Sequence, residues 1–245
     1  ATGYDAHKPT AYTMQEWQAL CKALDEICKN ATDYHISTKP RVRRLSVNTA
    51  RMARAAVYLG ASAALRVGEL CDIKLCDVNE HQLTYRVVKH RGFAEPKTVP
   101  MMPLAWKQIQ SYLEVRKGDD ENLFPSRQQV GSYYKPAFEL AGIEKVNGRH
   151  GIHKFRHLFA SSSLEYTDAT GRQAVLDQSS TEAQKSYITS ESMSRLASEV
   201  YEIHQGRLAD SLAERIEWDG TVGRFYPNAM ALQEAPVIPP ENQGI

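Results

Sequence analysis

The sequence has 245 residues, of which 42% are hydrophobic and 24% are charged, and its formal net charge is +1. This length allows one large domain or two small ones with a buried core. No run of about 18 apolar residues is available for a membrane span, and the N-terminus has no apolar signal-peptide core. We therefore expect a cytoplasmic protein without a membrane partner.

The charges are distributed unevenly along the chain. Residues 1–190 carry 26 Lys and Arg against 20 Asp and Glu, whereas residues 191–245 carry 4 against 9. One stretch, residues 39–54, has six cations and no acid, a density that favours phosphate binding. A solvated basic face is the alternative. The candidate DNA-phosphate-binding residues are Lys39, Arg41, Arg43, Arg44, Arg51 and Arg54.

The four cysteines are spaced seven and five residues apart around one long gap, at Cys21, Cys28, Cys71 and Cys76. These spacings fit neither a CxxC zinc pair nor a dense disulfide framework. We expect free thiols that are buried in the core.

Helical patterns dominate the first third of the chain. Thr13 and Glu16 form a predicted capping box, in which each side chain accepts a hydrogen bond from the other residue's backbone N–H. Apolar residues at helical spacing then predict a helix over residues 14–29. A second helix is expected after Ser46 and a third over residues 66–73.

The pattern changes after this point. The stretch QLTYRVVKHRGFAEPKTVPMMPL, residues 82–104, combines β-branched and aromatic residues with Gly and Pro, which predicts two or three short strands joined by turns. Helical patterns then return, at residues 105–116, 131–141, 153–166, 169–176, 181–187 and 192–215. The predicted fold class is mainly α with a small antiparallel β-sheet.

The helix expected at residues 153–166 begins with basic and hydrogen-bonding residues. In GIHKFRHLFASSS, His153, Arg156 and His157 follow a glycine within a few positions. Arg and His side chains near a helix N-terminus suit a phosphoryl group, because a guanidinium binds two oxygens and free backbone N–H groups add to the field. The sequence has no GxxxxGK[ST] loop for a nucleotide and no evident carboxylate cluster for Mg²⁺. Metal-free phosphoryl transfer needs cations, a proton donor and a side-chain nucleophile.

Three further stretches accompany HKFRH in a fixed order: AALRVGELCDIKLCDV (63–78), VVKHRG (87–92) and VLDQSSTEAQKSYIT (175–189). Together they resemble the catalytic domain of the tyrosine recombinase (phage integrase) family, with its first-arginine, β-hairpin lysine, HxLRH and LGHSS…Y motifs. The resemblance covers roughly residues 13–189. Each motif alone is weak, whereas four in the right order at compatible spacing are specific.

The resemblance implies a role for each matching residue. Arg66 and Arg156 would bind the non-bridging oxygens of the scissile DNA phosphate. Tyr187 would attack the phosphorus and become a 3′-phosphotyrosine. Lys89 would protonate the leaving 5′-oxygen, with Lys97 on the following strand as the rival candidate.

Two more residues would support this chemistry. His153 would hydrogen-bond the phosphate and assist the proton transfer, the alternative being a helix-capping or buried histidine. Glu69, three residues after Arg66, is placed to brace the guanidinium, the alternative being a solvent-facing side chain. The resemblance implies no metal and no cofactor, because the phosphotyrosine stores the energy of the broken bond.

The chain departs from the family pattern at one catalytic position. Nine residues before Tyr187, where the family usually has His and sometimes Trp, stands Gln178, and Asp177 replaces the preceding glycine. A Gln side chain donates an N–H to a phosphate oxygen but does not carry a proton as imidazole does. The expected rate penalty is about tenfold to a thousandfold if the family histidine does chemistry, and small if it only positions the phosphate.

The resemblance also predicts a domain organisation. We expect a linker or remnant of an interdomain connection at residues 1–12, a catalytic domain at 13–190, a helical extension at 191–230 and a disordered tail at 231–245. Family members usually carry a core-binding domain before the catalytic one, so a fragment of a longer protein is expected. The amphipathic extension suits docking on a neighbouring subunit, covering the chain's own basic site, or an extra core helix.

The predicted function is site-specific DNA recombination, in which four subunits exchange strands between two duplexes through covalent tyrosyl intermediates and a Holliday junction. The expected partners are double-stranded DNA and further copies of the chain in a tetrameric synapse. A type IB topoisomerase or a telomere resolvase would use the same chemistry. Gln178 motivates a further alternative, a catalytically impaired DNA-binding relative. A helical interaction module ranks last, because it leaves the six-cation run unexplained.

Overall fold

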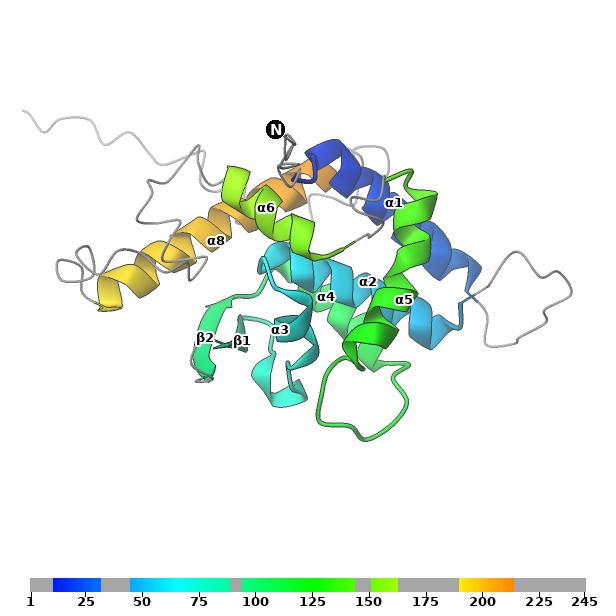
Figure 1. The fold of residues 1–245 in the computed structure, drawn as a ribbon, viewed down its shortest axis with the longest axis horizontal. Coiled ribbons are helices and arrows are strands. Elements are labelled where there is room, and N and C mark those ends of the chain that lie inside the picture. The colour runs from blue at the N-terminus through cyan, green and yellow to red at the C-terminus, as the bar shows by residue number, and fades with distance from the viewer. Residues whose placement is uncertain (1–10, 32–44, 89–93, 144–150, 163–189, 214–245) are drawn as a thin grey trace, which may run out of the picture.

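The computed structural model describes residues 11–31, 45–88, 94–143, 151–162 and 190–213. Within them the chain is mainly helical with one two-stranded antiparallel sheet, which confirms the predicted fold class (Figure 1). The elements are α1 (Met14–Asn30), α2 (Val47–Ser62), α3 (Val67–Cys71), a 3-10 turn (Leu75–Asp77), β1 (Gln82–Val88), β2 (Ala94–Pro100), α4 (Pro103–Leu113), α5 (Arg127–Leu140), α6 (His153–Ser162) and α8 (Ser190–Ala213).

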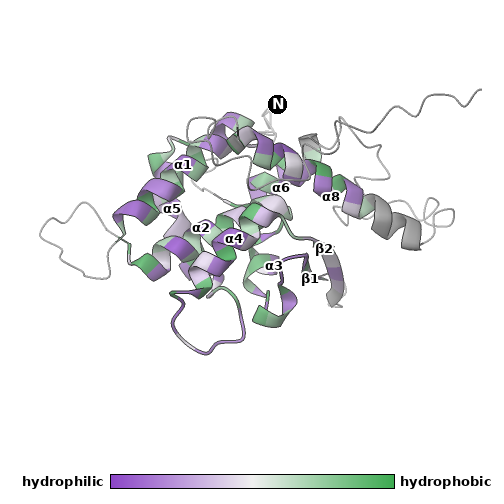
Figure 2. Cartoon of the chain, turned by 180° about the vertical axis from the view of Figure 1, so that it is seen from behind, coloured by the Kyte–Doolittle hydropathy of each residue, from purple (hydrophilic) through white to green (hydrophobic). Residues whose placement is uncertain are grey.

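Helix α2 lies at the centre of the fold. It contacts α1, α3, α4, α5, α6 and α8, and its residues 55–62 are all buried. Many of these residues are alanines, whose small side chains let neighbouring helices approach closely. The surrounding helices carry both polar and apolar residues (Figure 2), and α1 buries Trp17, Leu20 and Leu24. The core therefore lies around α2.

The N-terminal ends of α1 and α2 are fixed by side chains. Thr13 Oγ1 accepts a hydrogen bond from Glu16 N at 3.1 Å, and Glu16 Oε2 accepts one from Thr13 N at 2.7 Å, which confirms the predicted capping box. Ser46 Oγ accepts a hydrogen bond from Thr49 N at 3.2 Å. Each bond satisfies a backbone donor that the first helical turn leaves unpaired.

The sheet is a single pair of strands in the region where strands are predicted. Its register places Tyr85 of β1 opposite Lys97 of β2. The side chains of Leu83, Tyr85 and Val87 are buried, as expected for alternate residues of a strand with one face on the core. Residues 89–93, between the strands, lie outside the described residues.

Helix α8 packs on the same core as the rest of the described chain. It contacts α1, α2 and β2, and its Val200, Leu208 and Leu212 are buried whereas Ile203 is 43% exposed. Trp17 Nε1 donates a hydrogen bond to Leu208 O at 3.3 Å. The described contacts of α8 are thus those of a core helix, and docking on another subunit stays a prediction.

Helix boundaries differ from the sequence-based expectations where a cap outweighs apolar periodicity. Helix α4 starts at Pro103, because proline fits the first helical position. Helix α5 starts at Arg127, four residues earlier than predicted, and Gln129 Oε1 accepts a hydrogen bond from Ser126 N at 3.3 Å at this end. Helix α3 ends at Cys71 instead of continuing to residue 73.

The other predictions concern two further helices, the cysteines and the absence of a membrane span. The helices predicted at residues 169–176 and 181–187 lie outside the described residues. All four cysteines are free, as expected. Burial is confirmed for Cys21 and Cys71, whereas Cys28 is only half-buried. The expectation is wrong for Cys76, which is exposed because it lies in the surface 3-10 turn. No described helix combines the length and the apolar character needed to cross a membrane.

Candidate active site

Arg66 and Glu69 form a close pair at the start of α3. Glu69 Oε1 accepts a hydrogen bond from Arg66 Nη1 at 2.6 Å, and Glu69 Oε2 accepts one from the Arg66 backbone N at 2.7 Å. The Glu69 side chain is 6% exposed, whereas that of Arg66 is 44% exposed. The buried carboxylate therefore holds the guanidinium from one side and leaves N–H donors on the exposed side.

The turn between α2 and α3 sets the position of Arg66. Leu65 N donates to Gly60 O at 3.1 Å, and Ala64 has a left-handed φ of 52°. This is the geometry of a Schellman helix stop, with alanine in the place where glycine is usual. A left-handed conformation costs a residue with a Cβ about 1 kcal/mol, so surrounding contacts must hold the turn.

Arg156 of α6 makes one such contact. Its Nη1 donates a hydrogen bond to Ala64 O at 3.1 Å, and the residue is buried. Ala64 lies two positions before Arg66 in the chain. This bond therefore fixes the two candidate phosphate-binding arginines, from α6 and from the start of α3, relative to one another.

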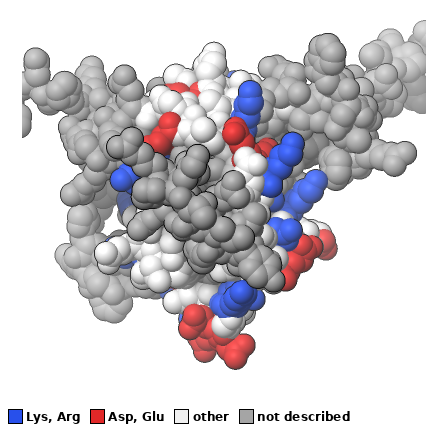
Figure 3. All heavy atoms as spheres, turned by 90° about the vertical axis from the view of Figure 1, so that its right-hand side faces the viewer, with Lys and Arg blue, Asp and Glu red and all other residues white. Residues whose placement is uncertain are grey.

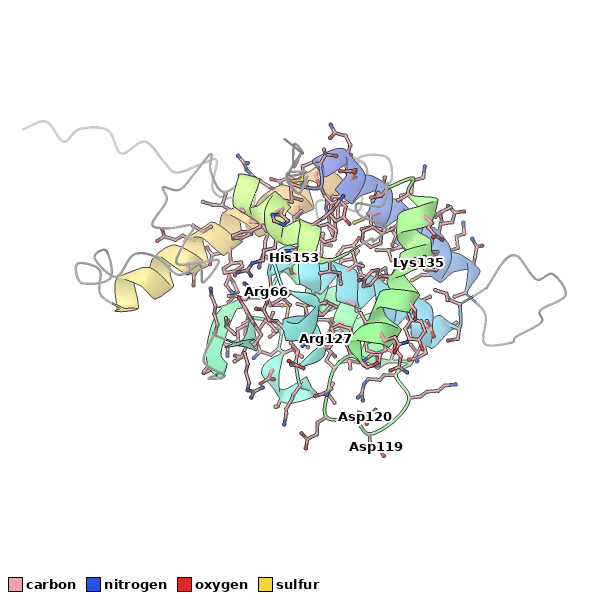
Figure 4. All side chains as sticks on the ribbon, in the orientation of Figure 1. Arg66, Asp119, Asp120, Arg127, Lys135 and His153 are labelled. Atoms are coloured by element: carbon pink, nitrogen blue, oxygen red, sulfur yellow. The ribbon has the colours of Figure 1, made fainter. Side chains whose placement is uncertain are left out.

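His153 is the first residue of α6 and lies near both arginines. Partial desolvation lowers the pKa of its imidazole, and the positive charges of His157, Arg156 and Arg66 lower it further, whereas Glu69 acts in the opposite direction. The rings of His153 and His157 meet edge to face at 5.0 Å. Figure 4 shows His153 next to Arg66, where α6 approaches α3. A neutral imidazole at this place has one hydrogen-bond donor and one acceptor.

The loop that precedes His153 is held by two contacts. A Cβ on Gly60 would lie 2.6 Å from Ile152 Cγ2, so the close approach of this loop to α2 requires glycine. Tyr12 Oη donates a hydrogen bond to Gly151 O at 3.1 Å. Burial raises the pKa of the Tyr12 phenol well above its usual value, which keeps it a neutral donor.

Other predicted site residues lie outside the described residues, namely Lys39, Arg41, Arg43, Arg44, Lys89, Gln178 and Tyr187. The structure thus brings together Arg66, Glu69, His153 and Arg156. The catalytic roles of these four residues, and of those outside the described ranges, stay predictions.

Lys97, the rival candidate for the proton donor, contacts the C-terminal helix. Its Nζ lies 5.9 Å from the centre of the Tyr201 ring, where a cation is attracted to the aromatic face. Lys97 is therefore engaged with α8 in this structure. The assignment of Lys89, and not Lys97, as the proton donor stays a prediction.

Arg51 and Arg54, which are predicted to bind DNA phosphates, have protein partners. Arg51 Nη1 donates to Glu114 Oε2 at 2.7 Å and to Ser111 O at 2.9 Å. Arg54 Nη1 donates to Asp25 Oδ1 at 3.1 Å. These bonds tie α2 to α4 and to α1. Phosphate binding by either arginine stays a prediction.

Arg127 is a cation near the site that the sequence reasoning did not single out. It is exposed at the start of α5 (Figure 4), and its guanidinium is so close to Gly68 that a Cβ there would overlap it. Gly68 lies two positions after Arg66, so a further guanidinium flanks the Arg66 segment. No sequence motif signals this proximity, because Arg127 and Arg66 are far apart in the chain.

The described surface carries both signs of charge. On the side where α1 and α5 lie, Lys and Arg occur along one edge with acidic residues beside them (Figure 3). Two further ion pairs join Lys74 to Glu121 at 2.7 Å and Arg86 to Asp77 at 3.4 Å. The described surface therefore has no uniform basic field, and the predicted phosphate binding would depend on local groups such as Arg66.

Two other features of the described residues lie outside this arrangement. No group of three or more His, Cys, Asp or Glu side chains among them could hold a metal ion. An open cavity of about 890 Å³ is lined by residues that include Asn48, Cys71, Arg116 and Phe124, but by neither of the candidate phosphate-binding arginines nor His153. Arg127, which flanks the Arg66 segment, also lines this cavity, whereas the four converging residues do not.

The sequence of this chain is similar to those of archaeal tyrosine recombinases. The tyrosine recombinase XerA of Thermococcus onnurineus is 32% identical over 136 residues, which are 52% of this chain and 48% of that protein. The tyrosine recombinase XerA of Thermococcus kodakarensis is 33% identical over 141 residues, with the same two shares. The chain spans about half the length of the curated relatives it matches.

The fold agrees with these relatives. A crystal structure of a XerA recombinase superposes with a TM-score of 0.52 at 21% identity, over 79% of this chain and 65% of that chain. The pattern described as the phage integrase family matches residues 18–192. This match covers more than half of the chain and includes the four residues that the structure brings together. The chain belongs to the phage integrase family.

Proposed function

We propose that this chain acts in site-specific DNA recombination, cutting and rejoining DNA strands through a 3′-phosphotyrosine intermediate. The observation that carries the proposal is the convergence of Arg66, Glu69, His153 and Arg156 from α3 and α6. Guanidinium groups next to a neutral imidazole suit a phosphodiester, whose charge grows on its non-bridging oxygens during the reaction. Membership of the phage integrase family supports the same reaction class.

In the proposed reaction, Arg66 and Arg156 donate hydrogen bonds to the non-bridging oxygens of the scissile phosphate. The Tyr187 hydroxyl gives up its proton with the assistance of His153, and its oxygen attacks the phosphorus. The bond to the 5′-oxygen breaks, and the 3′-phosphate remains on the tyrosine. Lys89 donates a proton to the leaving 5′-oxygen. A 5′-hydroxyl then attacks the phosphotyrosine, which releases Tyr187 and rejoins a strand without a metal or cofactor.

His153 and Gln178 complete the proposed arrangement. The lowered pKa of His153 leaves its imidazole neutral near pH 7, so that one ring nitrogen donates to a phosphate oxygen and the other assists proton transfer. Gln178 supplies an amide N–H to the phosphate. This donor replaces the hydrogen bond of the histidine that the family usually has there, but not its proton transfer.

The proposal extends to the assembly that strand exchange needs. Exchange between two duplexes requires four strand cuts, and one tyrosine for each cut implies a tetrameric synapse on double-stranded DNA. The DNA products distinguish a recombinase from other enzymes that use the same phosphotyrosine chemistry. Inversion or excision indicates a recombinase, relaxation of supercoils a type IB topoisomerase, and hairpin ends a telomere resolvase.

Covalent trapping tests the chemistry. The protein is incubated with nicked duplexes from its own genetic neighbourhood and denatured, and DNA adducts are mapped by mass spectrometry. We expect an adduct on Tyr187 that disappears in Tyr187→Phe, and a lower yield with Arg66→Ala. The absence of an adduct on every substrate, with salt-sensitive DNA binding retained, would favour the catalytically impaired relative that Gln178 suggests.

A further inference from the structure

The buried face of α8 contains a histidine that no part of the proposed reaction uses. His204 is completely buried, with 0% exposure, in a helix that contacts α1, α2 and β2. Its neighbours at the same depth include Tyr201 and Leu208, which are also fully buried. Burial of a polar ring is unfavourable unless a specific hydrogen bond compensates, so the bonds of this ring are informative.

His204 has one hydrogen bond among the described residues, and it is to the end of α2. Its Nε2 lies 3.1 Å from Ala61 O. A carbonyl oxygen only accepts, so Nε2 carries the proton and donates. Nδ1 has no hydrogen-bond partner within the described part of the chain. The ring is therefore committed to this single carbonyl.

Ala61 belongs to the last turn of α2, where backbone carbonyls lack partners in the helix itself. The turn that follows contains the Leu65 N to Gly60 O bond and the left-handed Ala64, and it leads directly into Arg66. The donor on His204 thus stabilises the end of α2, which this turn connects to Arg66 at the start of α3.

The same imidazole also contacts the helix that carries the second arginine. Phe159 of α6 meets the His204 ring edge to face, with 4.6 Å between the ring centres. Phe159 lies three positions after Arg156, hence on a neighbouring part of the same helical surface. Arg156 in turn donates to Ala64 O at 3.1 Å. His204 therefore touches both segments that the Arg156 to Ala64 bond joins.

We propose that His204 is a positioning residue for the phosphate site, and that it sets the distance between Arg66 and Arg156 by holding the end of α2 against α6. The inference rests on the proposed function for its effect on cleavage. Its structural part, the control of the turn over residues 61–66 by α8, stands without it. The segment that follows the proposed nucleophile in the chain thereby acts on the groups that bind the phosphate.

Two substitutions at His204 separate positioning from packing. His204→Leu fills much of the ring's volume but donates no hydrogen bond. His204→Gln retains an amide N–H that reaches toward Ala61 O. Both variants are compared with the wild type for DNA affinity, thermal unfolding, and the single-turnover rate of adduct formation with saturating nicked duplex.

We expect His204→Leu to lower the single-turnover rate about 10- to 100-fold, as misplacement of a substrate-binding group does, while DNA affinity changes less than about threefold. His204→Gln should restore the rate to within about fivefold of the wild type. Equal rates in His204→Leu and wild type would overturn the proposal. So would a loss of rate in both variants that follows their loss of thermal stability, because packing alone would then explain the effect.

Amide hydrogen exchange tests the structural part without any activity. In His204→Leu we expect exchange of the Leu65 amide, which donates to Gly60 O, to accelerate at least tenfold, and His204→Gln to reverse most of this change. The matched control is the Ala50 amide, which donates to Ser46 O at the other end of α2 and should not change. Unaltered Leu65 exchange in His204→Leu would contradict the proposal even if the wild type forms no adduct on any DNA.

Discussion

Glu69 is the residue that directly contacts the Arg66 guanidinium in the described structure. Two oxygens of one buried carboxylate accept both the backbone N–H and a side-chain N–H of Arg66. Removal of the carboxylate frees the guanidinium to rotate, although the positive charge remains. The orientation of Arg66, as distinct from its charge, therefore depends on Glu69.

We expect Glu69→Ala to lower the rate of Tyr187 adduct formation about 10- to 100-fold, because an unbraced guanidinium is less well placed for the phosphate. Glu69→Gln, which retains one acceptor oxygen, should lose less. The rate is measured in single-turnover reactions. Glu114→Ala is the control, since Glu114 is an exposed partner of Arg51, and a comparable loss in this variant would contradict the role of Glu69.

His204 makes the stability of the fold dependent on pH. Burial lowers the pKa of the imidazole from its usual 6.5 to about 4. Between these values the unfolded chain binds a proton that the folded chain does not, so stability falls as pH decreases from 6.5 to 4. The full difference is on the order of 3 kcal/mol. Arg207 on the same helix also disfavours the charged ring.

This pH dependence is measured by urea unfolding of wild type and His204→Gln between pH 7.5 and 4. This range covers both the usual pKa of histidine and the lowered pKa of His204. The free energy of unfolding of the wild type should decrease more steeply toward acid than that of the variant. Carboxylates titrate equally in both proteins, so the difference isolates His204. Parallel curves would show that the imidazole is protonated as easily in the folded state as in the unfolded state.

At the scale of secondary structure elements, the contact between α2 and the start of α6 depends on Gly60. The methyl group of Gly60→Ala would lie 2.6 Å from Ile152 Cγ2, so the loop before His153 must move. We expect a loss of about 1–3 kcal/mol in unfolding free energy and a lower adduct rate. Gly206→Ala is the matched control, because outside the neighbouring backbone of its own helix no described atom lies within 4 Å of the added Cβ. This change should raise stability by about 0.5–1 kcal/mol, and destabilisation by it would undermine the comparison.

Helix α8 is expected to contribute to stability through its buried face. Leu208 is fully buried and Ile203 is 43% exposed on the same helix. Leu208→Ala should lower the free energy of unfolding by about 2–4 kcal/mol, because it leaves a cavity in the core, whereas Ile203→Ala should change it by less than about 1 kcal/mol. Denaturant unfolding measures both. Similar values for the two variants would mean that α8 does not pack on the core of its own chain in solution.

At the scale of the whole molecule, Arg54 and Arg66 represent two kinds of surroundings for an arginine side chain. Arg54 bonds to Asp25 on α1 and to Ser111 on α4, whereas Arg66 keeps a half-exposed guanidinium at the candidate site. Both were candidates for phosphate contact on sequence alone. Their surroundings lead us to expect different effects on DNA affinity.

The salt dependence of DNA affinity distinguishes the two kinds. Each phosphate contact contributes about 0.9 to the slope of log affinity against log salt concentration. Arg66→Ala should therefore lower the slope by about 1. Arg54→Met should leave the slope unchanged and lower unfolding free energy by about 0.5–1 kcal/mol. A smaller slope for Arg54→Met would instead support the phosphate contact that the sequence predicts, and a flat salt response of the wild type would contradict DNA binding.

The sequence by itself determined the features that depend on neighbouring residues. The Thr13–Glu16 capping box is a pair of local hydrogen bonds, so its residue types and spacing were sufficient to predict it. The start of a helix after Ser46 was predicted from the local pattern, and the hydrogen bond from Thr49 N to Ser46 Oγ lies at this start. The mainly helical pattern with two or three short strands was predicted for the same reason, and the described residues contain one pair of strands. The order of the motifs around Arg66 and HxxR also indicated the family to which the chain belongs.

Only the tertiary structure decided how these segments meet. The bonds from Arg156 to Ala64 O and from His204 to Ala61 O join residues that are far apart in the chain, and no periodicity encodes such contacts. The same holds for the ion pairs of Arg51 and Arg54. The residue type determines the charge and the hydrogen-bonding groups of a side chain. The packing of helices that are distant in sequence determines its partners and its exposure to water.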